Sequence, residues 1–204
     1  MRIALIVEGD TESALKGALL RLIAERVSTR HMPRFTWNVQ RGRIPTGDSL
    51  RKLVARILKD RRQHPDAVIA LTDVYTGPVI AFRDAADAKS KMARWVGPES
   101  RFYAHAAQYD FEAWLIPYWG VIQRLTGSNR RQPAHPERIN HNKPPSRLLN
   151  EIFSAGTYRR SYIKTIDAQK ILAGQDLTIA ANACPELKSF LNTILTLCGG
   201  EQLP

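Results

Sequence analysis

The sequence predicts an α/β fold with a mostly parallel sheet, helices on both faces and a helical C-terminal elaboration. Two apolar runs rich in β-branched residues, 2–7 (RIALIV) and 67–72 (AVIALT), have the composition of strands buried on both faces. Stretches with helical periodicity separate these runs from two further strand-like segments, and this alternation is typical of a parallel sheet. After residue 147 the pattern is helical.

The first two strands and their helices occupy the N-terminal third. The strand 2–7 leads to Gly9, which turns the chain, and then to a helix that Asp10 or Thr11 can cap and that runs to about Val27. Residues 35–40 (FTWNVQ) alternate well enough for a second strand. A helix over 48–62 follows, because apolar residues recur at i, i+3, i+4, i+7 and i+8: Leu50, Leu53, Val54, Ile57 and Leu58.

The remaining elements complete the alternation and add a tail. The strand 67–72 ends at Asp73, a helix covers about 79–95, and 101–107 (RFYAHAA) forms a fourth strand. The stretch 126–147 is polar and rich in Pro and Asn, so we expect a long loop, followed by three or four helices to about Leu197. Pro185 suits a first helical position. We interpret 1–125 as the α/β core, and 126–204 as a basic loop plus a helical elaboration of the same domain.

The overall charge favours a polyanionic partner. The 204 residues include 30 Lys or Arg and 19 Asp or Glu, a formal net charge of +11, and the isoelectric point is about 10.1. Such a balance favours nucleic acid as a partner. No apolar run approaches the roughly 20 residues of a membrane span, and the N-terminus lacks a signal-peptide core. Cys184 and Cys198 have no metal-type spacing, so we expect a cytoplasmic protein with reduced cysteines.

Acidic side chains follow three of the four predicted strands. Glu8 ends the first strand, Asp73 ends the third, and Asp110 ends the fourth with Glu112 close behind. Because ligands of an open parallel sheet gather at the carboxyl ends of the strands, we expect these acids to meet at one edge. Glu12, in the first turn of the following helix, can lean back toward the same edge.

Such a cluster of like charges needs a cation between its members, since otherwise each carboxyl pKa is raised. Lys and Arg side chains are one source of positive charge, and a hard divalent cation such as Mg²⁺, which prefers oxygen ligands, is another. A metal site of this kind polarises phosphoryl oxygens, and one of the acids can shuttle a proton. The alternative is that the acids are ordinary helix caps and strand-end residues, a reading that suits Asp10 and Thr11. The spacing alone leaves both readings open.

Positive charge gathers in two stretches. Residues 21–62 hold twelve Lys or Arg against three acids, and a second basic set lies in or beside the polar loop. Arg41 and Arg43, just after the second strand, are placed to hold a scissile phosphate. We predict nucleic-acid contact for ten residues: Arg41, Arg43, Arg51, Lys52, Arg56, Lys59, Arg130, Arg131, Lys143 and Arg147. For any single residue of the 48–62 helix, the alternative is a solvated helix face.

Tyr75 and three histidines are also considered for the site. Tyr75 stands beside Asp73 at a strand end, where its hydroxyl can orient a ligand. His135 and His141 lie in a Pro-rich loop without a third ligand, so we do not interpret them as a metal pair. His105 alternates within a strand and is expected to be a core histidine.

Three stretches resemble the motifs of a TOPRIM domain, the metal-binding fold of topoisomerases, bacterial primases and OLD-family nucleases. IALIVEGDTE resembles the OLD-type first motif, ALTDVYTGP the second, and AAQYDFEAWL the acidic strand-to-helix motif that follows. The whole chain is similar to a family of small stand-alone TOPRIM-like proteins of unknown function. Five landmarks carry this similarity, in order: Asp73-Val74-Tyr75, Asp110-Phe111-Glu112-Ala113, Pro145-Ser146, Tyr162-Ile163-Lys164 and Cys184-Pro185.

The resemblance implies a TOPRIM-like, and hence Rossmann-like, sheet and a Mg²⁺- or Mn²⁺-dependent phosphoryl-transfer site, in the first place that of a nuclease. It implies that the metal ligands are Glu8, Asp73, Asp110 and Glu112, and that Glu8 and Glu12 serve in catalysis. For Lys164, which lies among Tyr162, Ile163 and Ile166, the resemblance implies stabilisation of transition-state charge. A lysine that merely extends from a helix surface is the alternative.

One departure from the TOPRIM pattern leaves other functions open. The second motif usually reads Asp-x-Asp, whereas this chain has Asp73-Val74-Tyr75, which puts a two-metal arrangement in doubt unless Asp110 or Glu112 compensates. OLD-like TOPRIM domains often act with an ABC- or SMC-type ATPase. This chain has no GxxxxGK[ST] motif, so an ATPase would be a separate partner. We expect DNA rather than RNA as substrate. The alternatives are a non-catalytic nucleic-acid-binding module and an ATPase-docking regulatory subunit of a prokaryotic defence system.

Overall fold

The computed structural model describes residues 1–28, 32–74, 81–139 and 143–204. The predictions for Tyr75 and His141 lie outside the described residues. The elements in chain order are β1 (Arg2–Val7), η1 (Glu12–Ala14), α1 (Leu15–Arg26), β2 (Arg34–Val39), α2 (Asp48–Leu58), β3 (Ala67–Asp73), α3 (Ala85–Val96), β4 (Phe102–Ala107), η3 (Phe111–Tyr118), α4 (Trp119–Thr126), η4 (Pro136–Arg138), α5 (Pro145–Ala155), α6 (Lys164–Leu172), α7 (Leu177–Ala183) and α8 (Pro185–Leu197).

The four strands form one sheet in the order β2-β1-β3-β4. Every neighbouring pair is parallel: β1 pairs with both β2 and β3, and β3 pairs with β4. The registers are continuous, so that Leu5 of β1 lies opposite Trp37 of β2 and Ile69 of β3. The parallel α/β fold that the sequence predicts is therefore confirmed. Because the strands run in one direction, the segments that follow them emerge at a single edge, which we call the carboxyl edge.

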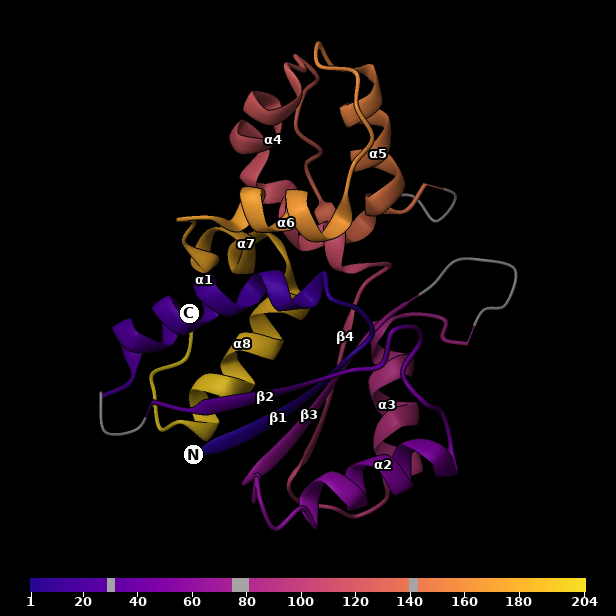
Figure 1. Cartoon of the computed structure of the whole chain (residues 1–204), viewed down its shortest axis with the longest axis vertical. Helices are drawn as coiled ribbons and strands as arrows, with labels where there is room; N and C mark the ends of the chain where they lie inside the picture. Colours follow the sequence, from indigo (N-terminus) through magenta and orange to yellow (C-terminus); the bar gives the residue numbers. More distant parts are fainter. Residues whose placement is uncertain (29–31, 75–80, 140–142) are drawn as a thin grey trace.

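Helices cover both faces of the sheet. Alternate residues of the central strands point to opposite faces. Ile3 and Leu5 of β1 join a large apolar cluster with residues of α1 and α8, whereas Ala4 and Ile6 join a second cluster with residues of α2 and α3. Figure 1 shows this layering, with α1 and α8 on one side of the strands and α2 and α3 on the other. All of β3 is buried, which explains why its sequence is apolar from Ala67 to Leu71.

The C-terminal half is helical, as predicted. Pro185 occupies the first turn of α8, and this helix ends at Leu197. Beyond the sheet, α4, η4, α5 and the described segments next to them form what we call the lobe, residues 119–139 and 143–163, at the top of Figure 1. Leu149, Ile152 and Phe153 of α5 belong to the same apolar cluster as β1.

Several boundaries differ from the sequence-based expectations. The first helix begins as the short η1, and neither Asp10 nor Thr11 caps it with a side chain: Thr11 is in the helical region and makes no capping hydrogen bond. β4 ends at Ala107, as in the predicted range 101–107, and Asp110 lies beyond the strand, after Tyr109, whose φ of 72° turns the chain. The predicted helix at 79–95 is observed as α3, Ala85–Val96. In the described part of the chain, no helix is both long and apolar enough to cross a membrane.

Candidate functional site at the carboxyl edge

Four acidic side chains line one cavity of about 190 Å³ at the carboxyl edge. They come from the end of β1 (Glu8), η1 (Glu12), the end of β3 (Asp73) and η3 (Glu112). All are buried, with exposed fractions of 4%, 4%, 8% and 1%. The structure thus brings together four of the five carboxylates that the strand-end argument selects. Gly9, Thr11, Gly42, Phe111 and Lys164 complete the wall.

Hydrogen bonds within the site fix three of these carboxylates. Glu8 accepts from the Thr72 hydroxyl, and its Oε1 lies 3.3 Å from the backbone N of Asp73. Asp73 Oδ1 accepts from the backbone N of Phe111 at 3.1 Å. Glu12 Oε2 accepts from the backbone N of Gly9 at 3.2 Å, which folds Glu12 back toward the strand end. These bonds join β1, β3 and η3 at the point where the acids meet.

Asp110 lies beside the cavity rather than on its wall. Its Oδ2 accepts from the backbone N of Ser146, in the first turn of α5, at 3.0 Å. Its Oδ1 is buried and has no hydrogen-bond partner among the described residues. Asp110 therefore ties the carboxyl edge to the N-terminus of α5, a role that the sequence did not reveal.

Lys164 supplies positive charge to the cavity. Its Nζ lies 3.1 Å from Glu112 Oε1, an ion pair whose geometry does not make a hydrogen bond. Although its neighbours in the sequence are apolar, Lys164 is not deeply buried: it is the first residue of α6, and its side chain is 54% exposed. Ile163 and Ile166 are also about half exposed. The long stem lets an accessible residue place its ammonium against a buried carboxylate.

Burial and mutual repulsion shift the ionisation of these groups. Burial, followed by the charges of Glu8 and Glu112, raises the pKa of Glu12 to about 7. Burial and the charge of Glu112 raise the pKa of Asp110 to about 7. Burial, with the surrounding carboxylates, holds the pKa of Asp73 well above its usual range. Burial alone would lower the pKa of Lys164, but its acidic neighbours, Glu112 foremost, raise it overall.

The donor set fits a hard divalent cation in its chemistry. Carboxylate oxygens are the ligands that Mg²⁺ and Mn²⁺ prefer, and the buried negative charge exceeds what Lys164 neutralises. In the arrangement observed, however, no three His, Cys, Asp or Glu side chains of the described residues stand as a ready set of metal ligands. Binding of a cation therefore requires that carboxylates such as Glu112 turn from their present partners.

These pKa shifts predict that the metal-free protein loses stability as pH rises from about 4.5 through 7. The folded state keeps protons on Glu12 and Asp110 up to about pH 7, whereas the unfolded chain releases them near 4.5 and 3.8. Stability therefore falls as pH rises toward and through 7. Burial lowers the pKa of His105 from 6.5 to about 4. This shift makes stability increase with pH, but only below about pH 6.5, where the unfolded chain protonates the histidine. Between pH 6.5 and 8 we expect the free energy of unfolding to fall by about 1 kcal/mol or more.

Urea unfolding in EDTA at these two pH values measures this change. Glu12→Gln should reduce the pH dependence, because it removes one of the two groups with a pKa near 7. An equal or greater stability at pH 8 in the wild type would contradict the shifted ionisation of the cavity.

The predicted nucleic-acid contacts of the first basic stretch divide into two groups. Gly42 lines the cavity and donates its backbone N–H to Glu8 O at 2.9 Å, so the exposed Arg41 and Arg43 flank the site. Arg51 and Lys52 lie on the first turns of α2, where both pair with Asp48. The chain enters α2 from the carboxyl edge and leaves it at the opposite edge.

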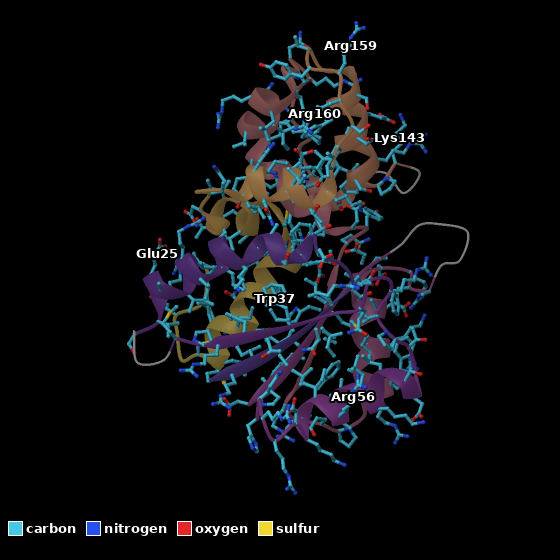
Figure 2. The ribbon with its side chains drawn as sticks, in the orientation of Figure 1. Glu25, Trp37, Arg56, Lys143, Arg159 and Arg160 are labelled. Carbon is cyan, nitrogen blue, oxygen red and sulfur yellow. The ribbon has the colours of Figure 1, made fainter. Side chains whose placement is uncertain are left out.

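Arg56 and Lys59 therefore lie away from the site. Arg56 is eight residues beyond Asp48, about 12 Å further along the helix. In Figure 2, Arg56 is labelled below the sheet, whereas Lys143, Arg159 and Arg160 are labelled in the lobe at the other end of the long axis. The ten predicted basic residues do not share one surface. Four of them belong to the lobe: Arg130, Arg131, Lys143 and Arg147.

Sequence reasoning missed two supporting interactions. Thr72 holds Glu8, and the only signal for it is a hydroxyl just before the end of a buried strand. Asp167, completely buried in α6, pairs with both terminal nitrogens of Arg160 at 2.7 Å and accepts from the backbone N of Ile163 at 2.8 Å. This contact fixes the start of α6 and hence the position of Lys164. The available signal was an acid in the first turn of a helix.

His105 and His135 do not line the carboxylate cavity. His135 lines a separate cavity with Glu137 and Arg138, so it is not part of the carboxylate site. His105 is buried and lies 3.0 Å from the Thr193 hydroxyl, consistent with the expected core role.

Fold and cavity define the chain as a TOPRIM-like α/β protein with a buried acidic site at the carboxyl edge. It belongs to the family DUF4276, a domain of unknown function, whose model matches residues 7–195. The C-terminal region of the Burkholderia pseudomallei OLD protein has a similar fold: identity is 14%, the TM-score is 0.50, and the match covers 96% of this chain and 98% of that one.

The C-terminal region of the Xanthomonas campestris pv. campestris OLD protein also matches. There the identity is 15% and the TM-score 0.49, with 97% of this chain and 94% of that one covered. At 14% identity, the similarity to the Burkholderia pseudomallei structure shows the fold alone. No curated protein sequence matches the chain.

Proposed function

We propose that the carboxyl-edge cavity binds Mg²⁺ or Mn²⁺ and that the protein is a nuclease, cleaving phosphodiester bonds of nucleic acid, DNA rather than RNA. The observation that carries this proposal is the convergence of four buried carboxylates and one lysine in a single cavity. The OLD-like fold and the net charge of +11 support it. When bound, the metal supplies Lewis-acid polarisation of a phosphoryl oxygen and activation of the attacking water.

The residues of the cavity have separate roles in the proposed reaction. Glu8, Asp73 and Glu112 would hold the cation, and Asp110 is close enough to Glu112 for their charges to interact. Glu12, with a pKa of about 7, is suited to accept and return a proton at neutral pH. Lys164 carries the positive charge that a phosphate needs as it approaches four acids, and Arg41 and Arg43 flank the entrance.

A second candidate function is a non-catalytic one, as a nucleic-acid-binding or ATPase-docking regulatory subunit. Two observations favour it: Lys164 already neutralises Glu112, and a ready set of three ligands is absent from the described residues. The chain has Tyr75 where the TOPRIM motif has an aspartate. A regulatory subunit would need a separate ATPase, because the chain has no phosphate-binding loop of its own.

Calorimetric titration of Mn²⁺ into the purified protein, followed by cleavage assays on labelled DNA and RNA, tests the proposal. The variant is Asp73→Asn, which can still accept from the backbone N of Phe111 but loses its charge. We expect saturable Mn²⁺ binding in the wild type that is weakened at least about tenfold in the variant. Asp60→Asn, at a surface turn after α2, is the matched control and should bind as the wild type does.

The candidate functions give different results in this experiment. Binding together with cleavage that requires the metal supports the nuclease. Metal binding without cleavage, alone or with a partner ATPase supplied, supports the regulatory role. If neither protein binds Mn²⁺ even with oligonucleotide present, the carboxylates are structural and the proposal fails.

A further inference from the structure

The outer end of the lobe is a tip built from two closely packed segments, residues 126–131 and 156–160. The Thr157 hydroxyl donates to Gly127 O at 3.1 Å, and the backbone N of Tyr158 lies 3.4 Å from Thr126 O. The segments pack so closely that a Cβ on Gly156 would lie 2.2 Å from Thr126 O. Only glycine fits there, so the tip has a fixed shape.

The base of the tip is anchored to the start of α6. The guanidinium of Arg160 lies 4.5 Å above the Phe153 ring and pairs with Asp167 through two hydrogen bonds of 2.7 Å. The backbone N of Arg160 donates to Phe153 O at 3.2 Å. The residues just before Arg160 are therefore presented outward from a rigid support.

Tyr158 and Arg159 are the residues presented. The Tyr158 side chain is 63% exposed, which makes it the most exposed large hydrophobic side chain among the described residues. Arg159 follows with a φ of 41°, a backbone region that few residues other than glycine adopt, and Figure 2 shows it at the outer end of the lobe. An exposed aromatic residue and an arginine thus follow one another at this turn.

The surroundings of this tip are strongly positive. Residues 124–164 contain nine Lys or Arg and only two acids, and one of these acids, Glu137, is buried. Among the described residues, Lys143 and Arg147 lie near Glu151, while Arg130, Arg131 and Arg159 make no ion pair. A polyanion would meet positive charge here that the protein itself does not neutralise.

We infer that the tip is a docking platform for single-stranded DNA, on which an unpaired base stacks on Tyr158 while Arg159, Arg130 and Arg131 contact the phosphates. Aromatic rings within basic surfaces are the common solution for binding unpaired bases, since every base has a face that stacks. A duplex hides these faces, so the platform selects an unpaired strand. As a step in substrate choice, the inference rests on the proposed nuclease function.

The tip lies within reach of the cavity. Arg159 is five residues before Lys164, so their Cα atoms are at most about 18 Å apart even with the chain fully extended. The rise per nucleotide along the axis of a stacked strand is about 3.4 Å, so this distance spans at most about five nucleotides. A strand held on Tyr158 can therefore extend into the carboxylate cavity, which places the cut a few nucleotides from the docked base.

Fluorescence anisotropy with labelled DNA, in EDTA so that no cleavage occurs, tests the platform. The probes are a mixed-sequence single strand of about 20 nucleotides, the same sequence as a blunt duplex, and the single strand as RNA. Tyr158→Ala should weaken binding of the DNA single strand about tenfold and that of the duplex little. Tyr158→Phe keeps the ring and should bind as the wild type does. Arg159→Ala should lower the slope of log affinity against log salt by about 0.7.

Ile179→Ala, a truncation of another exposed apolar side chain on α7, is the matched control and should change nothing. Thermal unfolding of all variants checks that the fold is retained. Unchanged single-strand binding in Tyr158→Ala, an equal loss for the duplex, or a Tyr158-dependent affinity for RNA alone would overturn the inference. So would a wild type that binds no nucleic acid, which would point to an acidic protein surface as the occupant. Because metal and cleavage play no part, failure of the platform and failure of the nuclease proposal are separate results.

Discussion

Glu8→Gln should lower the rate of metal-dependent cleavage at least about 100-fold while leaving nucleic-acid affinity within about twofold of wild type. Loss of one preorganised charge at a reacting phosphate typically removes several kcal/mol of transition-state stabilisation, and each 1.36 kcal/mol is a factor of ten in rate. The substitution is otherwise mild. A glutamine oxygen can still accept from the Thr72 hydroxyl and from the backbone N of Asp73, so the strand ends stay joined.

Single-turnover cleavage of labelled DNA with saturating Mn²⁺ measures this effect directly. Glu25→Gln makes the same chemical change on an exposed face of α1 and should cleave at the wild-type rate; Figure 2 shows Glu25 at the margin of the molecule. Cleavage by Glu8→Gln at more than a tenth of the wild-type rate would remove Glu8 from the catalytic machinery. If the wild type itself does not cleave, the regulatory role becomes the better account of the cavity.

Asp167→Ala should reduce the free energy of unfolding by about 3 kcal/mol. Asp167 is fully buried, and its removal leaves the Arg160 guanidinium without its counter-charge and the backbone N of Ile163 without an acceptor. Breaking a buried ion pair from one side costs several kcal/mol, because the remaining charge is desolvated and unpaired. Arg160 is one-third exposed, which keeps the expected loss at the lower end of that range.

Urea denaturation followed by circular dichroism gives the loss in stability. Asp48→Ala is the control, since its ion pairs with Arg51 and Lys52 lie on an exposed helix surface and should contribute about 1 kcal/mol or less. The double variant Arg160→Met, Asp167→Leu should recover part of the stability, because apolar groups of similar volume can replace a buried pair. Equal losses in Asp167→Ala and Asp48→Ala would show that the buried pair contributes nothing beyond surface charge.

The predictable parts of this structure follow from the pattern of apolar residues along the chain and from the common direction of parallel strands. A buried parallel strand has a recognisable composition, and parallel strands must end at the same edge, so the meeting of Glu8, Asp73 and Glu112 follows from their positions in the sequence. Lys164 was assigned to the site only because of the resemblance to the TOPRIM-like family. No pattern in the sequence shows that a lysine at the start of a helix lies against a carboxylate some fifty residues earlier.

The rest was not predictable because it depends on side chains that meet across segments. The two-point contact of Arg160 with Asp167 requires a turn whose path no local rule specifies. The sequence shows two basic stretches but not their place in space, and α2 runs away from the carboxyl edge and carries Arg56 and Lys59 with it. No pattern in the sequence shows that Asp110, a predicted metal ligand, also lies at the N-terminus of α5, where its charge interacts favourably with the helix dipole.

Because of this last contact, the stability of the first turn of α5 depends on the ionisation of Asp110, which in turn depends on the charges in the cavity. The carboxylate that caps α5 has a pKa of about 7, which Glu112 helps to raise and Lys164 helps to lower. An ionised Asp110 is a stronger acceptor for the Ser146 N–H than a protonated one. By linkage, whatever stabilises that ionised form also stabilises the contact of α5 with Asp110, and whatever holds α5 in place favours ionisation to the same extent. The ionisation of Asp110 beside the cavity and the stability of the α5 N-terminus in the lobe are thus thermodynamically linked.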